Sequence, residues 1–189
     1  MAPDQVAMPP RTLVLVGLMG AGKSSVGRRV ASRLGLPFYD ADAEIEAAAG
    51  CSISDLFARY GEASFRTGER RVMRRLLGGP RAVIATGGGA FIDPETRALI
   101  SAQAISVWLR ADLNVLEKRV VGRDHRPLLK EGDPRTILSA LMEKRHPIYA
   151  EADLVVDSLD QPTDLTVSAV LKALTDFVRG METQEALTR

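Results

Sequence analysis

The chain has 189 residues, 46% of them hydrophobic and 26% charged, and its formal net charge is +1. This length suits one domain with a substantial core, and the balanced charge gives no global basic field for binding nucleic acid. The single cysteine, Cys51, excludes an internal disulfide and favours a cytoplasmic protein. No apolar run reaches the roughly 18 residues of a membrane span, so we expect neither nucleic acid nor a membrane as a partner.

The N-terminal segment, residues 1–10, contains three prolines and one charged residue. It lacks the cationic and apolar regions of a signal peptide, so we predict a disordered tail. A single domain is expected over residues 11–180, followed by a frayed C-terminus at residues 181–189.

Residues 17–24 fit the pattern G-x-x-x-x-G-K-[ST] of a phosphate-binding loop. Its glycines let backbone N–H groups turn inward around phosphates, Lys23 reaches the β- and γ-phosphates, and the Ser24 hydroxyl can ligate Mg²⁺. A β-branched apolar run at residues 12–16 predicts a buried strand before the loop, and apolar spacing predicts a helix over residues 23–34 after it. A turn that binds nothing would not explain Gly-Lys-Ser at a helix N-terminus, where anions bind.

Strands and helices continue to alternate after this unit. Four more apolar segments predict strands at residues 36–40, 82–85, 104–109 and 154–156. Helical patterns fall at residues 42–49, 52–60, 62–77, 94–101, 113–121, 134–149 and 162–179. The stretch 122–133 is polar, broken by glycine and proline, and predicted to be a mobile loop. Five apolar strands alternating with helices predict an α/β fold, with a parallel sheet covered on both faces.

Two polar or glycine-rich clusters follow predicted strands, where ligands sit in parallel sheets. Asp40 and Asp42 follow the second strand. Near a phosphate loop one acid can hold Mg²⁺ and another can take the proton of an acceptor hydroxyl, although one of the two, Asp42 in particular, could instead cap the next helix. Gly87, Gly88 and Gly89 follow the third strand. Such a run favours close approach of a ligand to the backbone, with a loose turn as the alternative.

Arginines form a second group of candidates. Arg66 and Glu69 share one helix face at i and i+3, either as a surface ion pair or with Arg66 in a functional role. Arg145 suits bidentate binding of a carboxylate. A solvated face is expected for Arg70, Arg71, Arg74 and Arg75. The mobile loop is surrounded by Arg119, Arg123, Arg126 and Lys130, so one arginine can close on the γ-phosphate as a lid.

In combination these residues resemble the shikimate kinase family, within the nucleoside-monophosphate-kinase group of P-loop proteins. The resemblance covers about residues 12–165 and rests on six motifs. They are the phosphate loop, Asp40-x-Asp42, Phe65-Arg66-x-x-Glu69, Gly87-Gly88-Gly89, Arg126-Pro127-Leu128-Leu129 and Arg145-x-Pro147-x-Tyr149. It implies a three-layer P-loop kinase fold with a five-stranded parallel sheet in the order 2-3-1-4-5. It also implies acceptor-binding helices at about residues 42–77 and a mobile lid at about 122–133, and we expect a monomer.

The resemblance further implies ATP-dependent phosphorylation of the 3-hydroxyl of shikimate, a step of aromatic amino-acid biosynthesis. The residues implied for ATP are Gly20, Ala21, Gly22, Lys23, Ser24, Ser25, Arg119, Arg126, Gln161 and Pro162. Those implied for Mg²⁺ are Ser24 and Asp40. Those implied for shikimate are Asp42, Arg66, Glu69, Gly87, Gly88, Gly89 and Arg145. The residues implied for catalysis are Lys23, the candidate base Asp42 and the lid cation Arg126.

Two other functions are compatible with a phosphate loop. A regulatory GTPase needs N-K-x-D and D-x-x-G, but the single asparagine, Asn114, is followed by Val115, and no aspartate has glycine three residues later. A P-loop kinase for a gluconate- or nucleotide-type acceptor stays open at this stage, because arginines bind phosphate as well as carboxylate.

Overall fold

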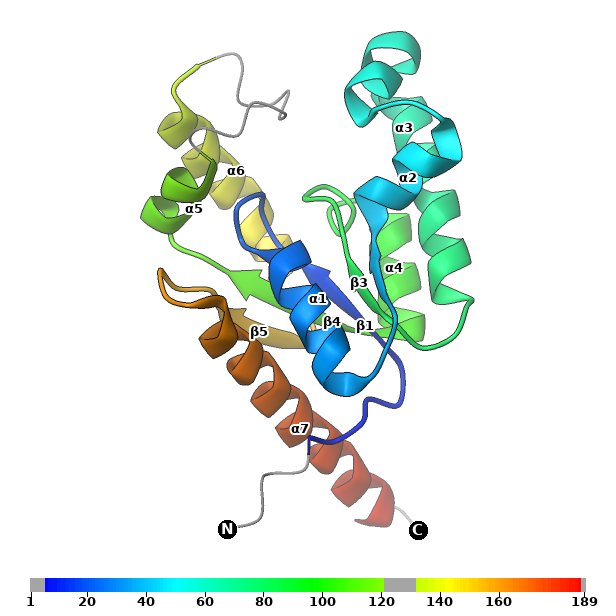
Figure 1. Cartoon of the computed structure of the whole chain (residues 1–189), viewed down its shortest axis with the longest axis vertical. Helices are drawn as coiled ribbons and strands as arrows, with labels where there is room; N and C mark the ends of the chain where they lie inside the picture. The colour runs from blue at the N-terminus through cyan, green and yellow to red at the C-terminus, as the bar shows by residue number, and fades with distance from the viewer. Residues whose placement is uncertain (1–5, 121–131, 188–189) are drawn as a thin grey trace.

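The structure, a computed structural model, describes residues 6–120 and 132–187 (Figure 1). The strands are β1 (Thr12–Val16), β2 (Phe38–Asp40), β3 (Val83–Ala85), β4 (Ala104–Arg110) and β5 (Leu154–Asp157). The helices are α1 (Lys23–Leu34), α2 (Ala41–Ala49), α3 (Ile53–Leu77), α4 (Pro94–Gln103), α5 (Leu113–Val120), α6 (Pro134–Tyr149) and α7 (Thr163–Leu187).

The five strands form one parallel sheet in the order β2-β3-β1-β4-β5, as the resemblance implied. Central β1 pairs with two strands, so that Leu13 lies opposite Val83 on one side and Ile105 on the other. Helices α1 and α7 lie side by side on one face, and α4 lies on the opposite face against β4 (Figure 1). All five residues of β1 are buried, which explains its unbroken apolar sequence.

Helix α1 begins directly at the phosphate loop and is held close to the sheet. Its buried stripe includes Val26, Val30 and Leu34, the three residues whose spacing predicts the helix. The helix ends at Gly35, whose left-handed backbone (φ 64°) lets its N–H group bond the last turn. A close contact at Gly27 fixes the distance between this helix and the sheet.

Replacing Gly27 by alanine is expected to lower the free energy of unfolding by about 1–3 kcal/mol, because the added methyl group overpacks the core. A Cβ atom there would lie 2.8 Å from Cε2 of Phe38 and 2.9 Å from Cδ1 of Leu15. The matched control is Gly180→Ala in α7, where nothing lies within 4 Å of the added atom. That change is expected to stabilise the helix by about 0.4–1 kcal/mol. Urea unfolding of both variants measures the difference, and equal effects would contradict the close packing.

Helix α3 combines the two helices predicted at residues 52–60 and 62–77. The predicted break at Gly61 is present as a kink with non-helical angles (φ 75°, ψ 174°). Ser52 caps the first part by accepting a hydrogen bond from the Asp55 N–H group. The kink therefore separates an exposed N-terminal portion from the part of α3 that carries Arg66 and Glu69.

Both ends of the described chain are more ordered than the sequence suggested. Helix α7 continues to Leu187, so the frayed C-terminus expected at residues 181–189 is wrong for residues 181–187. The predicted tail is packed at residues 6–10, where Ala7 N–H donates to Thr175 and the Pro9 carbonyl accepts from Arg81. Residues 1–5 and 188–189 lie outside the described part. None of the helices in residues 6–120 and 132–187 has the length and hydropathy to cross a bilayer.

Candidate active site

The phosphate loop links β1 to the N-terminus of α1. Gly22 occupies the N-cap position with φ 91°, a left-handed conformation that favours glycine, and no side chain caps the helix there. The first N–H groups of α1 therefore face the loop, which is the arrangement that binds phosphate at a helix N-terminus. Lys23 is only 9% exposed, and its Nζ donates to the carbonyls of Gly17 (2.8 Å) and Leu18 (3.0 Å).

Asp40 connects the loop to the end of β2. The Ser24 hydroxyl donates to its Oδ2 at 2.6 Å, and the Asp42 N–H group donates to its Oδ1 at 3.2 Å. Asp40 is therefore the N-cap of α2, and the alternative in which Asp42 caps this helix is wrong. A hydroxyl next to a carboxylate suits Mg²⁺, which keeps several waters and binds through one or two carboxylates plus the substrate phosphates.

A cleft of about 310 Å³ opens over the phosphate loop. It brings together residues that follow each of the five strands, from the loop after β1 to the turn after β5. Its lining comprises Gly20, Gly22, Lys23, Ser24, Ser25, Val26, Asp40, Asp42, Thr86, Gly87, Gly88, Arg119, Ser158, Asp160, Gln161, Thr163 and Thr166. A phosphate-binding surface and a carboxylate of α2 thus share one cavity.

The glycine run after β3 lies directly against functional side chains. A Cβ atom on Gly87 would lie 2.5 Å from Oδ1 of Asp42, and one on Gly89 would lie 2.5 Å from Nη2 of Arg66. No side chain larger than hydrogen fits at either position without displacing these groups. The glycines here allow close approach of Asp42 and Arg66 to the backbone, and approach of a ligand to this backbone stays a prediction.

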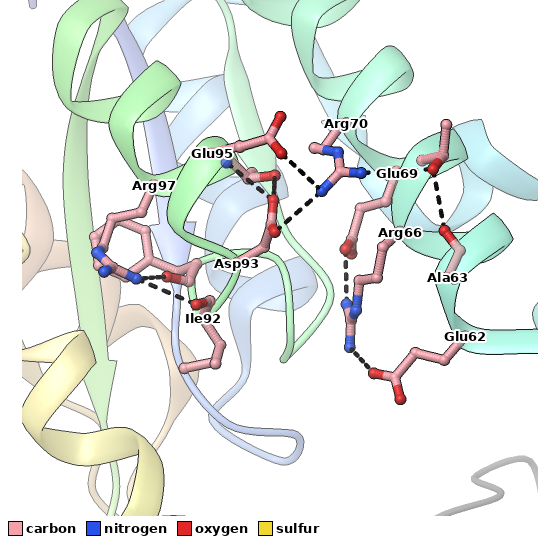
Figure 2. Close-up of polar contacts among 12 residues, drawn as sticks. Glu62, Ala63, Arg66, Glu69, Arg70, Ile92, Asp93, Glu95 and Arg97 are labelled. Carbon is pink, nitrogen blue, oxygen red and sulfur yellow. Dashed lines mark hydrogen bonds and ion pairs between the residues drawn. The ribbon is translucent and has the colours of Figure 1, made fainter.

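Arg66 lies between two glutamates of the same helix, as Figure 2 shows. Its Nη1 donates to Glu69 Oε2 at 2.7 Å and its Nη2 to Glu62 Oε1 at 3.2 Å. The Glu69 side chain is only 2% exposed, so this is not a surface ion pair. Burial raises the pKa of Glu69; the Arg66 charge opposes that rise, and the nearby Asp42 and Asp93 add to it. Burial acts to lower the pKa of Arg66, but the hydrogen bonds and negative charges of Glu69 and Glu62 together outweigh it, so the pKa is raised and the guanidinium stays charged.

Arg145 reaches the same glycine run from α6. Its Nη1 donates to the Gly88 carbonyl at 3.1 Å, and the Tyr149 hydroxyl donates to the same oxygen. Burial raises the pKa of Tyr149 to about 12, so its phenol keeps the proton that it donates. Two arginines from different helices therefore converge on adjacent glycines.

Arg119 of α5 closes the opposite end of the cleft. Its Nη1 donates to the Gly20 carbonyl (3.2 Å) and to Ser158 Oγ (2.9 Å), and its Nη2 donates to the Leu159 carbonyl (2.6 Å). These bonds join the phosphate loop, α5 and the turn after β5. Ser158 is 2% exposed and was not predicted from the sequence; its position directly after β5 was the available signal.

The predicted site residues differ in where they lie relative to the cleft and to the described part of the chain. Arg126 and its motif, with most of the predicted lid, lie outside the described residues. Gln161 lines the cleft, whereas the predicted residues of the described part that do not line it are Ala21, Arg66, Glu69, Gly89, Arg145 and Pro162. Arg71, Arg74 and Arg75 are exposed as expected. Arg70 departs from that prediction, because its side chain is only 25% exposed and contacts Asp93.

The comparisons with known proteins concern the chain as a whole. A family model described as shikimate kinase matches residues 19–175. The curated shikimate kinase of Paramagnetospirillum magneticum is 66% identical over 168 residues, which cover 89% of this chain and 86% of that protein. That of Caulobacter vibrioides is 57% identical over 171 residues, covering 90% and 86%.

Solved structures agree with the sequence comparison. A shikimate kinase from Acinetobacter baumannii in complex with shikimate has a TM-score of 0.83 and 34% identity, covering 90% of this chain and 96% of that one. A gluconokinase from Sinorhizobium meliloti has a TM-score of 0.63 at 21% identity, over 94% and 99% of the two chains. The second likeness shows a shared fold alone.

Proposed function

The chain belongs to the shikimate kinase family and phosphorylates shikimate with ATP as the co-substrate, and we propose that the acceptor is the 3-hydroxyl and that Mg²⁺ assists the transfer. One observation carries the proposed geometry: Lys23, Ser24 and Asp42 line the same cleft. A phosphoryl donor on the loop and a hydroxyl acceptor at Asp42 would therefore face each other in one cavity.

The loop side of the cleft would hold the nucleotide phosphates. Backbone N–H groups of residues 20–25 would surround them, and Lys23 would offset the charge that builds up on the transferred group. Ser24 and Asp40 would hold Mg²⁺, which supplies charge stabilisation when bound. The Ser24–Asp40 hydrogen bond of 2.6 Å supports this pairing, since it keeps both oxygens at one place.

The α2 and α3 side would hold the acceptor. Asp42 would bind shikimate hydroxyls and take the proton of the attacking 3-hydroxyl, while Arg66 and Arg145 would grip the carboxylate. Support comes from the convergence of both guanidinium groups on Gly88 and Gly89. Glu69 would orient Arg66, and its burial supports this role, because the 2.7 Å hydrogen bond from Arg66 holds a carboxylate that is only 2% exposed.

The remaining assignments concern the two ends of the nucleotide. Arg119, Gln161 and Pro162 would flank the adenine, which agrees with the position of Arg119 and Gln161 on the cleft. Arg126 would close on the phosphates as part of the lid and stabilise transition-state charge. The single cysteine supports a cytoplasmic location for the enzyme.

A coupled assay of ADP release over a panel of acceptors tests the acceptor and the alternative kinases. With shikimate, quinate, gluconate and a nucleoside monophosphate at equal concentration, only shikimate is expected to support rapid turnover. Quinate serves as the matched control, since it also carries a carboxylate on a hydroxylated ring. Faster turnover with gluconate or the nucleotide would overturn the assignment, and NMR of the shikimate product identifies the phosphorylated hydroxyl.

A further inference from the structure

The glycine run is followed by a segment, residues 90–93, that two arginines hold from opposite sides (Figure 2). Ala90 and Phe91 are buried anchors, and the N–H groups of Ile92 and Asp93 both bond back to the Gly89 carbonyl, at 3.1 and 3.4 Å. These hydrogen bonds therefore attach the segment to the backbone of Gly89. Any group that fixes the segment also fixes the glycine backbone.

On the α3 side the holding group is Arg70. Its Nη1 lies 3.3 Å from Asp93 Oδ1, while Asp93 Oδ2 accepts from the N–H and hydroxyl of Thr96 and so caps α4. Arg70 stands four residues after Arg66, on the same face of α3. We call residues 89–93 the glycine segment. Helix α3 thus contacts the glycine segment at two places, with Arg66 at Gly89 and with Arg70 at Asp93.

On the α6 side the holding group is Arg97. Its Nη1 donates to the carbonyls of Phe91 (3.0 Å) and Ile92 (3.2 Å). Its Nε lies 2.9 Å from Oε2 of Glu151, just beyond the end of α6. Helix α6 carries Arg145, so each of the two holding arginines joins the glycine segment to the region of one proposed carboxylate-binding arginine.

We propose that Arg70 and Arg97 are positioning residues for the acceptor: they hold the glycine segment at the separation from α3 and α6 that lets Arg66 and Arg145 share one carboxylate. Little space separates Arg66 from the glycine backbone, because a Cβ atom placed on Gly89 would lie 2.5 Å from Arg66 Nη2 and 2.6 Å from its Nη1. Gly88 lies between α6 and the phosphate loop, since a Cβ atom placed on it would lie 3.7 Å from Arg145 Nη1 and 3.6 Å from the backbone nitrogen of Met19. This inference rests on the proposed roles of Arg66 and Arg145.

The test replaces each holding arginine by glutamine and measures steady-state kinetics for both substrates. Arg70→Gln and Arg97→Gln are each expected to raise the KM for shikimate about fivefold, with kcat and the KM for ATP changed less than about twofold. Arg70→Lys, which keeps the charge, is expected to recover most of the loss. Arg74→Gln is the matched control: Arg74 lies one turn later on α3, its side chain is 62% exposed, and its Nη2 lies 3.8 Å from Oε2 of Glu95.

Asp93→Asn is the second route to the same result, because asparagine still caps α4 while the Arg70–Asp93 ion pair is lost and the ion pair of Arg70 with Glu95 on α4 remains. A lower melting temperature with an unchanged KM for shikimate would show a merely structural role and overturn the inference, as would an equal rise in both KM values. Arg66→Lys is measured beside these variants. If it leaves the KM for shikimate unchanged, the proposed function of Arg66 fails; if it raises this KM and the other variants do not, only the positioning role fails.

Discussion

Asp42→Asn is expected to lower kcat by roughly 100- to 10,000-fold, the range for loss of a general base. The amide keeps the shape of the side chain but cannot accept the proton of the attacking hydroxyl. The KM for ATP is expected to change little, because the phosphate contacts proposed for the loop and Lys23 remain. The α2 cap also remains, because it is made by the Asp40 side chain and the Asp42 backbone.

Glu44→Gln provides the control for this change. It is the same acid-to-amide replacement two residues later in the first turn of α2, at a side chain paired with Arg75 at 2.6 Å near the surface. Its kcat is expected to stay within about twofold of the unmodified enzyme, since exposed ion pairs of this kind contribute about 0–1 kcal/mol. Near-normal turnover of Asp42→Asn would eliminate Asp42 as the base, and transfer would then depend on positioning and charge stabilisation alone.

Local pattern was enough to predict most of the fold. Strand β1 and helix α1 are recognisable because burial on both faces produces a continuous apolar run and burial of one helix face produces a period near 3.6. The lateral order of the strands has no such local signature, and it came from the resemblance. The ordered end of α7 was missed because Gly180 resembles a stop, although a glycine inside a helix costs only about 1 kcal/mol.

The candidate site was predictable where its residues follow strands, since a parallel sheet gathers those positions at one edge. The sequence could not decide whether Asp40 or Asp42 caps α2, because both precede a helix at suitable spacing. It also placed Arg70 on a solvated face, because its partner Asp93 is 23 residues away. The partners of Arg119 are also distant in the sequence, on the phosphate loop and beyond β5, and only the tertiary structure brings them near.

Arg66→Lys is expected to raise the KM for shikimate roughly 10- to 100-fold, the equivalent of one or more lost hydrogen bonds to a charged group. Lysine keeps the positive charge but loses the planar fork that serves Glu69 and a substrate carboxylate at the same time. The buried Glu69 would compete for the single ammonium group, because its side chain is 2% exposed and a buried carboxylate without a positive partner is costly. The KM for ATP is expected to stay within about twofold, since Arg66 does not line the cleft over the phosphate loop.

Arg74→Lys is the control for the chemical change itself, because this arginine lies on the same helix at 62% exposure. The substrate gives an independent check on the carboxylate assignment. The methyl ester of shikimate removes the negative charge, so it is expected to bind the unmodified enzyme weakly and to lose little more with Arg66→Lys. If the ester and the acid respond equally to the substitution, Arg66 does not grip the carboxylate. An equal rise in the KM values for ATP and shikimate would instead point to a general disturbance of α3.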